Sequence, residues 1–578
     1  MTSSGPGGMR IYKSGRPRRR RGRRAGPIVA VVVILLVLAA LAAAAYATGF
    51  GDSLLGRSSR PSPSPSTALS PSPSLTTTSP GPSPSPKPSP LASGLPRKKG
   101  DGVKIATFLG NETRRYYGLG PLPRRLGLIW RCNIGTGKTS GAPKKRPETW
   151  SGTGWTGQAA LVRDKGRLYL LVGGFDHNLH KIDARAGALV WESPWPDVMK
   201  SSPTVFKNPR PKGPDDRYIV MCGARRGFPL GFTDPAIAPY RAVTFGSGAE
   251  LWRLPVPLTA SYSRDCDGSS FYLGGRAYLG VESGLFYVFD PLRTVTWNGY
   301  RRPVVIESRQ LLGDAGTRAA HAGNLVLEAS PALLKDRIYI SSGSGFVYGM
   351  RRDDLRIVWA YRTGSDLDGT AVPTADGMLL VPVEKQYITG HGGVLMLDPS
   401  KPPDRSRVWF FPTGDRKYSD WLGGVIGSVA VNDSYNADGR HPSLAAFNAI
   451  DGNLYVVAQD AFAKQRVPGP DNEPRLRTPV QVFKAPIGGG ISTPVMVDDG
   501  IVAAGYDGIV HLYRITYSNS RKGRPGALKS PDGKWWKVRV KETSRYGGGG
   551  SFESTPICWD GRIYIGSRSG WFYCLGTR

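Results

Sequence analysis

The chain has 578 residues, a formal net charge of +33, and a composition that includes 75 Gly, 49 Pro and 5 Cys. So many chain-breaking residues exclude a helical bundle and favour many short strands joined by turns. The excess of positive charge predicts anionic surroundings, such as lipid headgroups or phosphate-bearing envelope polymers.

The first fifty residues indicate a membrane anchor. Residues 10–24 carry a run of Arg and Lys without an acid, and Ile28–Ala47 follows without any charge. An apolar helix of about twenty residues spans a bilayer, and flanking cations stay on the cytoplasmic side. We predict a basic cytoplasmic tail over residues 1–26 and a transmembrane signal anchor over residues 27–49.

Single-pass localisation in the cell membrane follows, with the N-terminus cytoplasmic and the remaining chain extracytoplasmic. The alternative is a cleaved signal peptide, because Ala45-Tyr46-Ala47 is an A-x-A type of cleavage site. Both alternatives place the folded part outside the cytoplasm.

The next segment has the composition of a spacer. Residues 57–96 repeat Pro, Ser and Thr with almost no large apolar side chain, so no core can form there. We predict a disordered, Pro/Ser-rich stalk over residues 50–103, followed by one folded domain over residues 104–578.

The end of the chain indicates how that domain closes. Ser554–Trp559, Arg562–Ser567 and Gly570–Leu575 are β-rich runs separated by hairpin-turn dipeptides. A three-stranded meander of this kind lacks a fourth strand, and the isolated β-rich run Leu126–Asn133 supplies one from the start of the domain. A ring closed by its own two ends is a β-propeller.

Similar four-stranded units recur between these ends and predict eight blades. Blade one is the clearest, with strands at residues 158–162, 167–172, 178–183 and 189–192. Blade six, from about residue 425 to residue 483, has long turns, and seven blades result if it is an insertion. The other blades begin near Ser202, Ser269, Ser330, Val372, Thr493 and Thr555, and the one that begins near Ser269 is expected to end near Trp297.

The repeat carries a tryptophan at the end of the fourth strand. In blade one, Asp183, Gly187 and Trp191 have the spacing D-x3-G-x3-W. The same strand end elsewhere carries Trp130, Trp252, Trp359 and Trp409. This pattern resembles the tryptophan-docked repeat of the PQQ-like (quinoprotein-type, BamB-like) propeller superfamily, in which the indole packs between neighbouring blades.

The expected fold class is therefore all-β: an eight-bladed β-propeller with tryptophan-docked repeats, closed by N- and C-terminal strands, plus one N-terminal transmembrane helix. The resemblance implies either a dehydrogenase dependent on pyrroloquinoline quinone (PQQ) or a cofactor-free scaffold. PQQ enzymes of this fold are expected to use an adjacent-cysteine disulfide, which this sequence lacks. We expect that the protein has no cofactor and is not an enzyme. The alternative is an enzyme that uses the funnel of the propeller, either with PQQ and calcium or to act on a carbohydrate.

The five cysteines admit two interpretations. Cys132 and Cys574 fall on strands predicted to be neighbours, so a disulfide there would join the two ends of the ring. Cys222 and Cys266 are the other candidate pair. The alternative is that all five are small apolar core residues.

Residues just before each first strand are expected to line the axial channel. Glu328, Asp368 and Glu553 fall at or near that position and are candidate ligands for a cation that prefers oxygen. Lys200 occupies the same position in blade two. The alternative is a set of solvated channel residues balanced by Lys200.

Two segments outside the repeat combine cations and flat aromatic rings, a mixture typical of recognition surfaces. The candidate binding residues are Arg114, Arg115, Tyr116, Tyr117, Trp150 and Trp155, together with Lys200. The alternative is an N-terminal strap packed across the propeller. The overall prediction is an envelope scaffold that binds a protein or an anionic polymer and no nucleic acid.

Overall fold

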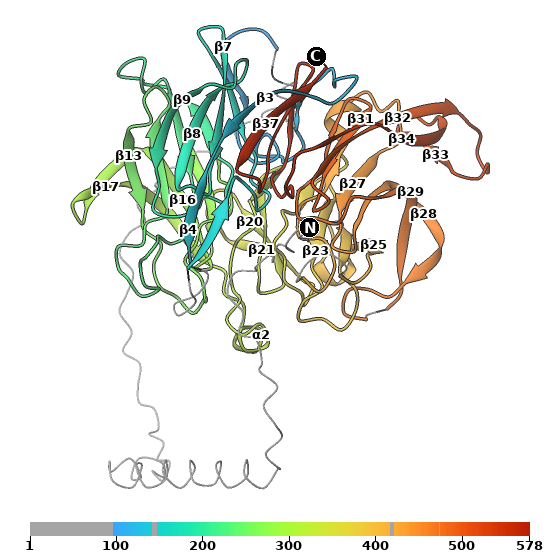
Figure 1. Ribbon diagram of the computed structural model, residues 1–578. Coiled ribbons are helices and arrows are strands. Elements are labelled where there is room, and N and C mark those ends of the chain that lie inside the picture. The colour runs from blue at the N-terminus through green and yellow to red at the C-terminus, as the bar shows by residue number, and fades with distance from the viewer. Residues whose placement is uncertain (1–95, 97, 141–146, 417–420, 473, 578) are drawn as a thin grey trace, which may run out of the picture. The chain divides into compact units, whose positions relative to one another are not determined.

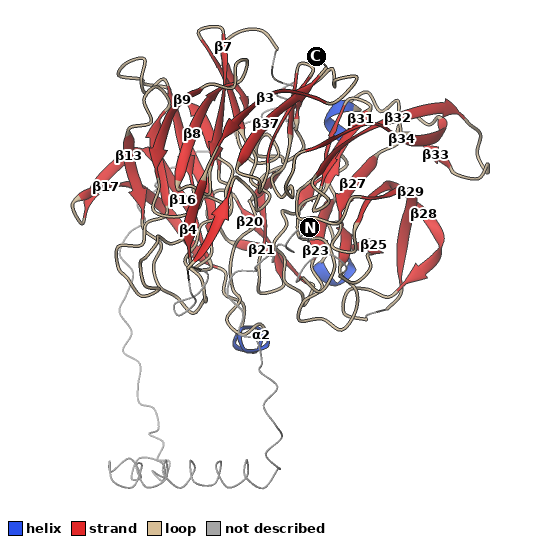
Figure 2. Ribbon diagram, in the orientation of Figure 1, coloured by secondary structure: helices blue, strands red, loops and turns tan. Residues whose placement is uncertain are grey.

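Nearly all strands belong to eight sheets, each built on four antiparallel strands. Figure 2 shows by colour that strands dominate the folded part. The computed structural model describes residues 96, 98–140, 147–416, 421–472 and 474–577, and the statements below concern these residues. The predicted tail, the predicted anchor and nearly all of the predicted stalk lie outside them. Within the described residues, helices are short, and none has the length and hydropathy needed to cross a bilayer.

The first four blades follow one another along the chain (Figure 1). Blade 1 contains β6 (Ala160–Asp164), β7 (Arg167–Gly173), β8 (Asn178–Asp183) and β9 (Leu189–Pro194). Blade 2 contains β10 (Thr204–Lys207), β11 (Tyr218–Cys222), β12 (Tyr240–Thr244) and β13 (Glu250–Leu254). Blade 3 contains β14 (Phe271–Leu273), β15 (Arg276–Val281), β16 (Leu285–Trp297) and β17 (Tyr300–Gln310). Blade 4 contains β18 (Ala332–Leu334), β19 (Arg337–Ser341), β20 (Phe346–Arg351) and β21 (Ile357–Arg362).

The last four blades have the same order of strands. Blade 5 contains β22 (Val372–Pro373), β23 (Leu379–Val383), β24 (Gly393–Leu397) and β25 (Arg407–Pro412). Blade 6 contains β26 (Ala430–Val431), β27 (Leu444–Asn448), β28 (Asn453–Val467) and β29 (Leu476–Pro486). Blade 7 contains β30 (Val495–Val497), β31 (Gly500–Ala504), β32 (Ile509–Asn519) and β34 (Trp535–Gly547), with β33 (Ala527–Lys529) added to β34. Blade 8 contains β35 (Ile557–Trp559), β36 (Arg562–Gly566), β37 (Trp571–Gly576) and β3 (Gly127–Asn133).

The predicted closure of the ring is confirmed. β3 pairs antiparallel with β37, so an early strand completes the last blade (Figure 1). Blade 6 is a full blade, which settles the count at eight rather than seven. The prediction for blade 3 was too short, because its fourth strand β17 lies beyond Trp297.

The hydrophobic core lies between blades. One cluster of buried side chains joins blades 1 and 2, and others join blades 2 and 3, 3 and 4, and 4 and 5. A larger cluster extends over blades 5 to 8, and another joins blade 8 to blade 1. Every blade is therefore held by both neighbours, and burial of these apolar faces is the main stabilising contribution.

The tryptophan repeat acts as the resemblance implies. Trp130 donates its indole N–H to the carbonyl oxygen of Ala184 in the next blade, at 3.3 Å. Gly187 has a φ of +75°, and a Cβ there would lie 2.5 Å from Trp130 Cδ2. The glycine of the repeat therefore leaves room for the tryptophan of the preceding blade. Equivalent indole bonds to the following blade are made by Trp191, Trp252, Trp359 and Trp409.

Short elements connect or extend the blades. A hairpin of β4 (Thr136–Thr139) and β5 (Glu148–Ser151) precedes blade 1. The helix α2 (Ala315–Ala320) follows blade 3, where the Asp314 carboxylate caps it by accepting from the Thr317 N–H. The remaining elements are η1 (Pro403–Arg405) in blade 5, η2 (Asp433–Tyr435) in blade 6, and β1 (Gly102–Ile105) and β2 (Gly118–Leu119) before the ring.

Candidate functional site

The innermost strands of neighbouring blades surround an axis, and a segment of the chain's own N-terminal side crosses it. We call residues 102–123 the plug. Its strand β1 pairs with β6 of blade 1, and its strand β2 pairs with β35 of blade 8. Between them, the Ala106 carbonyl accepts from Val205 in blade 2 at 2.7 Å, and the Glu112 carbonyl accepts from Leu333 in blade 4 at 2.7 Å.

Arg114 fixes the centre of the plug. Its side chain is fully buried and donates to the carbonyl oxygens of Pro331 at 2.8 Å, Phe108 at 2.6 Å and Ser269 at 3.0 Å. These bonds tie the plug to blades 3 and 4 at once. Burial lowers the pKa of Arg114 to about 9, and the carbonyl oxygens replace the water that the guanidinium has lost.

Tyr117 anchors the other half of the plug. Its hydroxyl accepts from the Val431 N–H in blade 6 at 2.9 Å, and its carbonyl accepts from the Cys558 N–H in blade 8 at 3.0 Å. The Tyr435 ring lies 6.3 Å from the Tyr117 ring. The plug is therefore bonded to blades on several sides of the ring.

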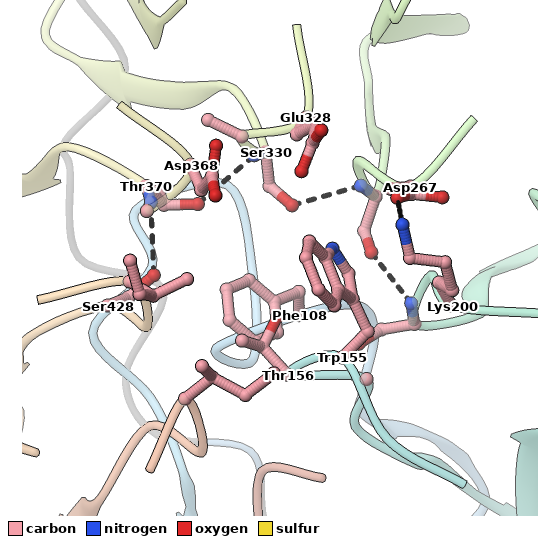
Figure 3. Close-up of a pocket in the computed structure, with 17 residues that line it drawn as sticks. Phe108, Trp155, Thr156, Lys200, Asp267, Glu328, Ser330, Asp368, Thr370 and Ser428 are labelled. Carbon is pink, nitrogen blue, oxygen red and sulfur yellow. Dashed lines mark hydrogen bonds and ion pairs between the residues drawn. The ribbon is translucent and has the colours of Figure 1, made fainter. Parts of the chain in front are cut away.

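A small chamber remains on the axis beside the plug (Figure 3). Phe108 of the plug and Trp155, from the segment before blade 1, occupy its middle. Trp155 has a φ of +54° and lies 5.8 Å from Trp421. The remaining cavity measures about 20 Å³. That is room for on the order of one water molecule or one ion.

Charged groups line one side of the chamber. Lys200 forms a fully buried ion pair with Asp267, and its ammonium lies 3.9 Å from the centre of the Trp155 ring (Figure 3). Behind this pair, Arg225 donates to the Asp265 carboxylate at 2.8 Å. Although burial opposes it, the charges of Arg225 and Lys200 keep the pKa of Asp265 below its usual value.

Two further acids are buried without a full set of partners. Glu282 Oε1 and Glu328 Oε2 accept no hydrogen bond from the described residues. Burial, followed by the negative charge of Asp265, raises the pKa of Glu282 to about 7. Burial together with Asp368 and Glu282 raises the pKa of Glu328 far above its usual value. Glu328 lines the chamber and Glu282 lies beside the lining residue Asp267, so these buried acids can hold protons or a single small cation at its edge.

Two groups of carboxylates present oxygen ligands close enough for one ion. In each of them the ligand atoms lie within 4.8 Å of one another. The first contains Asp265, Asp267 and Glu282 and includes the ion pairs described above; the second contains Asp366, Asp368 and Glu384. In the second, Asn324 and Gln386 donate to Asp366 at 2.6 and 3.1 Å.

The predicted metal candidates separate in the structure. Glu328 and Asp368 line the same chamber as Lys200 (Figure 3). Glu553 is not among the residues that line it, and its carboxylate instead forms an ion pair with Arg568 at 3.4 Å. The sequence did not indicate Asp267 or Glu282. Asp267 lies in the long connection before β14, where Ser269-Ser270 takes the place of the Ser-Pro or Thr-Pro pair that begins several other blades. Glu282 directly follows β15 and so does not precede a first strand.

The chamber does not fit PQQ. Sites for organic ligands typically enclose about 300–1,000 Å³, whereas this cavity measures about 20 Å³. Phe108 and Trp155 line this cavity and leave no room beside it on the axis for a tricyclic ring system. The carboxylates alone would suit a calcium ion, but not the quinone beside it.

The predicted recognition surface is not exposed. Arg114, Tyr116, Tyr117, Trp150, Trp155 and Lys200 are all at least 90 % buried, and Arg115 is partly buried. The alternative interpretation, a strap packed on the propeller, describes these residues better. Their cations and rings hold the plug and the chamber together instead of facing a partner.

The predicted disulfides were wrong. All five cysteines lie in the described part of the chain, and all are buried free thiols. Cys132 and Cys574 do lie on neighbouring strands, but the register places Cys132 opposite Phe572 and Cys574 opposite Trp130. Cys222 and Cys266 belong to the clusters on opposite faces of blade 2.

No protein-family model matches the sequence, and no curated protein sequence is similar to it. Solved structures with a similar fold include BamB from Moraxella catarrhalis, at 14 % identity and a TM-score of 0.43, covering 78 % of this chain and 98 % of that one. Quinohemoprotein alcohol dehydrogenase from Comamonas testosteroni is similar at 12 % identity and a TM-score of 0.46, covering 83 % of this chain and 81 % of that one. Both are PQQ-like β-propeller proteins, the superfamily whose repeat the sequence resembles. The similarity concerns the fold alone.

Proposed function

We propose that the protein is a binding scaffold of the cell envelope, anchored in the membrane by residues 27–49, with its propeller on the extracytoplasmic side. The observation that carries this proposal is the closure of the axis by the plug, which leaves a cavity of about 20 Å³. An organic substrate has no room on the axis, which favours binding of a partner by the outer faces and edges of the blades.

The location rests on the sequence. The Arg-rich residues 10–24 precede the uncharged run at residues 28–47, and the positive-inside rule then directs the following chain across the membrane. Residues 57–96, rich in Pro and Ser, supply a spacer between the anchor and the propeller. A scaffold needs such a spacer if its partner lies away from the bilayer surface.

Two kinds of partner suit the outer surface. The positive charge that remains in the folded part, after the Arg-rich tail is set aside, favours an anionic envelope polymer. Exposed apolar residues on edge strands, such as Val190 at 47 % and Val358 at 40 %, also favour a protein. Both positions directly precede the docked tryptophan of their blade.

The full chain, expressed in intact cells, provides the test. A photo-crosslinking amino acid at position 190 or 358 should capture an envelope component, and protease added outside the cells should release the propeller by cutting the stalk. Protection of the stalk from external protease would overturn the location. The purified full chain, given PQQ and Ca²⁺, should not reduce an electron-acceptor dye with alcohol substrates. Dye reduction would overturn the scaffold in favour of the dehydrogenase alternative.

A further inference from the structure

Blades 3, 6 and 7 have long outer strands, and among the described residues those of blade 7 alone carry an added strand, β33, beside them. In blade 7, β32 has 11 residues and β34 has 13, whereas the inner strands β30 and β31 have three and five. The outer halves of β32 and β34, with β33 beside them, therefore project beyond the blade as a three-stranded ribbon (Figure 1). We call residues 514–545 the basic ribbon.

Positive charge is concentrated on this ribbon. Its acids are Asp532 and Glu542 alone. Asp532 pairs with Lys534 at 2.9 Å, and Glu542 pairs with Arg545 at 2.5 Å, so the acids neutralise only their neighbours. Its basic residues are Arg514, Arg521, Lys522, Arg524, Lys529, Lys534, Lys537, Arg539, Lys541 and Arg545.

Because successive side chains of a strand point to opposite faces, part of this charge lies on one face of the ribbon. Along β34, Lys537, Arg539 and Lys541 are exposed, and the residues between them are half-buried. Successive side chains on one face of a strand lie about 7 Å apart. The register places Arg514 of β32 opposite Lys541, but its half-buried guanidinium donates to the carbonyl oxygens of Leu122 and Pro123, so the exposed cations of this face are those of β34. No described acid lies within ion-pair distance of Lys537, Arg539 or Lys541.

The opposite face fixes the ribbon to the propeller. Tyr517 of β32 stacks on His441 of blade 6 with 3.7 Å between ring centres, and Trp536 of β34 meets the same imidazole edge-on at 5.2 Å. Val538 and Val540 pack against the large core cluster of blades 5 to 8. The charged face is therefore held toward solvent on a rigid support, which lowers the entropy cost of binding.

The charged row leads to a cleft. Arg545, four residues beyond Lys541 in β34, lines a cleft of about 530 Å³ together with Phe483 and His511. The His511 ring bonds Asp507 at 2.9 Å and Glu542 at 2.8 Å. Although burial opposes it, these carboxylates raise the pKa of His511, so the imidazole favours its cationic form. The cleft is large enough for one small organic unit.

We propose that this face of the basic ribbon, centred on Lys537, Arg539 and Lys541, binds a linear phosphodiester polymer of the cell envelope; the choice of an envelope polymer rests on the proposed function. Lysine ammonium and arginine guanidinium groups form charge-assisted hydrogen bonds with phosphate oxygens. A flexible polyanion can bring successive phosphates to a row of cations on one strand. The affinity should then fall steeply with salt, as counterions are released from the polymer on binding.

Other anionic partners fit this face less well. A surface that inserts into lipid needs exposed large apolar side chains beside its cations. Between residues 509 and 547, all of which the structure describes, no large apolar side chain is exposed. Sequence-tolerant binding of single-stranded nucleic acid uses exposed aromatic platforms on which bases stack. Of the ribbon aromatics, Tyr517 stacks on His441, Trp536 meets the same imidazole edge-on, and Trp535 is half-buried, so none is a fully exposed platform.

The test compares two full-length variants of equal charge. The ribbon variant carries Lys537→Gln, Arg539→Gln and Lys541→Gln. The blade-1 variant carries Lys165→Gln, Arg167→Gln and Arg185→Gln at exposed positions and serves as the matched control. Binding of poly(glycerol phosphate) is measured by titration calorimetry from 50 to 300 mM NaCl. Thermal unfolding of both variants confirms that each is folded.

We expect the ribbon variant to bind the polymer about tenfold or more weakly at low salt, and the slope of log K against log salt to fall by about 2. The blade-1 variant should bind like the parent. Equal losses in both variants, or no loss in the ribbon variant, would overturn the proposal. Tighter binding of single-stranded DNA or of phosphatidylglycerol vesicles, at equal phosphate concentration, would also overturn it.

The two proposals fail in different ways. If the ribbon variant still yields the parent's crosslinks in cells but the polymer does not distinguish the two variants, the ribbon inference is wrong and the scaffold stands. If only the ribbon variant loses polymer binding but external protease never cuts the stalk, the proposed location of the scaffold is wrong and the proposal that the ribbon binds a phosphodiester polymer remains.

Discussion

The backbone N–H of Ser269 in blade 3 donates to the hydroxyl oxygen of Ser330 in blade 4 at 2.9 Å. The same bond recurs around the axis, each blade donating to the next. Thr555 then donates to the Gly157 carbonyl, which returns the ring to blade 1. The acceptors along this ring are the hydroxyls of Ser202, Ser269, Ser330, Thr370, Ser428, Thr493 and Thr555.

The loss of unfolding free energy on removal of one hydroxyl should give the contribution of one hydrogen bond of this ring. Ser330→Ala leaves the buried Ser269 N–H without its acceptor, and an unsatisfied buried donor costs about 1–3 kcal/mol. We expect that loss in the free energy of unfolding, measured by urea denaturation. Ser330→Thr keeps the hydroxyl that Thr370 and Thr493 supply elsewhere and should cost less. Equal losses in both variants would show that the ring bond is not the cause.

A second prediction concerns the docking of Trp130 on Gly187. Trp130→Ala should lower the free energy of unfolding by about 3–5 kcal/mol, because a large buried aromatic ring is lost. Gly187→Ala should also destabilise, since its Cβ would lie 2.5 Å from Trp130 Cδ2. In the double variant the loss of the Trp130 ring remains, but the clash disappears, so Gly187→Ala adds only the cost of a positive φ.

The double-mutant cycle should therefore give a coupling of about 1 kcal/mol or more. The control is Trp252→Ala with Gly187→Ala, because Trp252 docks on Pro291 in a different pair of blades. That pair should be additive. Coupling of the same size in the control would contradict the local explanation.

The blades could be predicted from the sequence because their signals are local. Turn dipeptides, alternating apolar residues and the spacing of Asp183, Gly187 and Trp191 all lie within one repeat, and Leu126–Asn133 was the one β-rich run without neighbours. The Ser or Thr before Pro could be recognised in the sequence as a recurring position of the repeat. Its hydroxyl accepts a hydrogen bond from the preceding blade, and that structural role became evident only in three dimensions.

The plug and the chamber depend on long-range placement. Arg114 and Tyr117 combine charge and aromatic rings in a way that sequence composition cannot distinguish from an exposed recognition surface. Their burial follows from bonds to Pro331 and Val431, more than two hundred residues away along the chain. The pairing of β3 with β37 was predicted, yet its register, which separates Cys132 from Cys574, was not.

The buried carboxyl of Glu282 should make stability depend on pH. Burial and the charge of Asp265 raise its folded pKa to about 7, above the ordinary value of 4.5. The folded state then disfavours the ionised carboxyl, so the free energy of unfolding should fall as pH rises from about 4.5 to about 7. Glu282→Gln removes this loss.

We expect Glu282→Gln to stabilise the protein at pH 8 by at most about 3 kcal/mol and to have little effect at pH 4.5. Urea denaturation at several pH values measures this, with the exposed Glu307→Gln as control. A stabilisation that is the same at every pH would point to packing and not to ionisation.

The free thiols give the last prediction. All five cysteines are buried, and burial raises the pKa of Cys222 and of Cys574 to about 12. Only the thiolate reacts readily with disulfide reagents, so the native protein should release almost no thiol to Ellman's reagent. The same sample, unfolded in guanidinium without reductant, should release all five.

The register of β3 and β37 explains why no disulfide forms there. Cys132 lies opposite Phe572, and a bridge to Cys574 would require the strands to slip by two residues. Dithiothreitol should therefore leave the midpoint of urea denaturation unchanged. A peptide containing Cys132 bonded to Cys574 in a non-reducing digest, or fewer than five thiols after unfolding, would contradict the structure at the point where the ring closes.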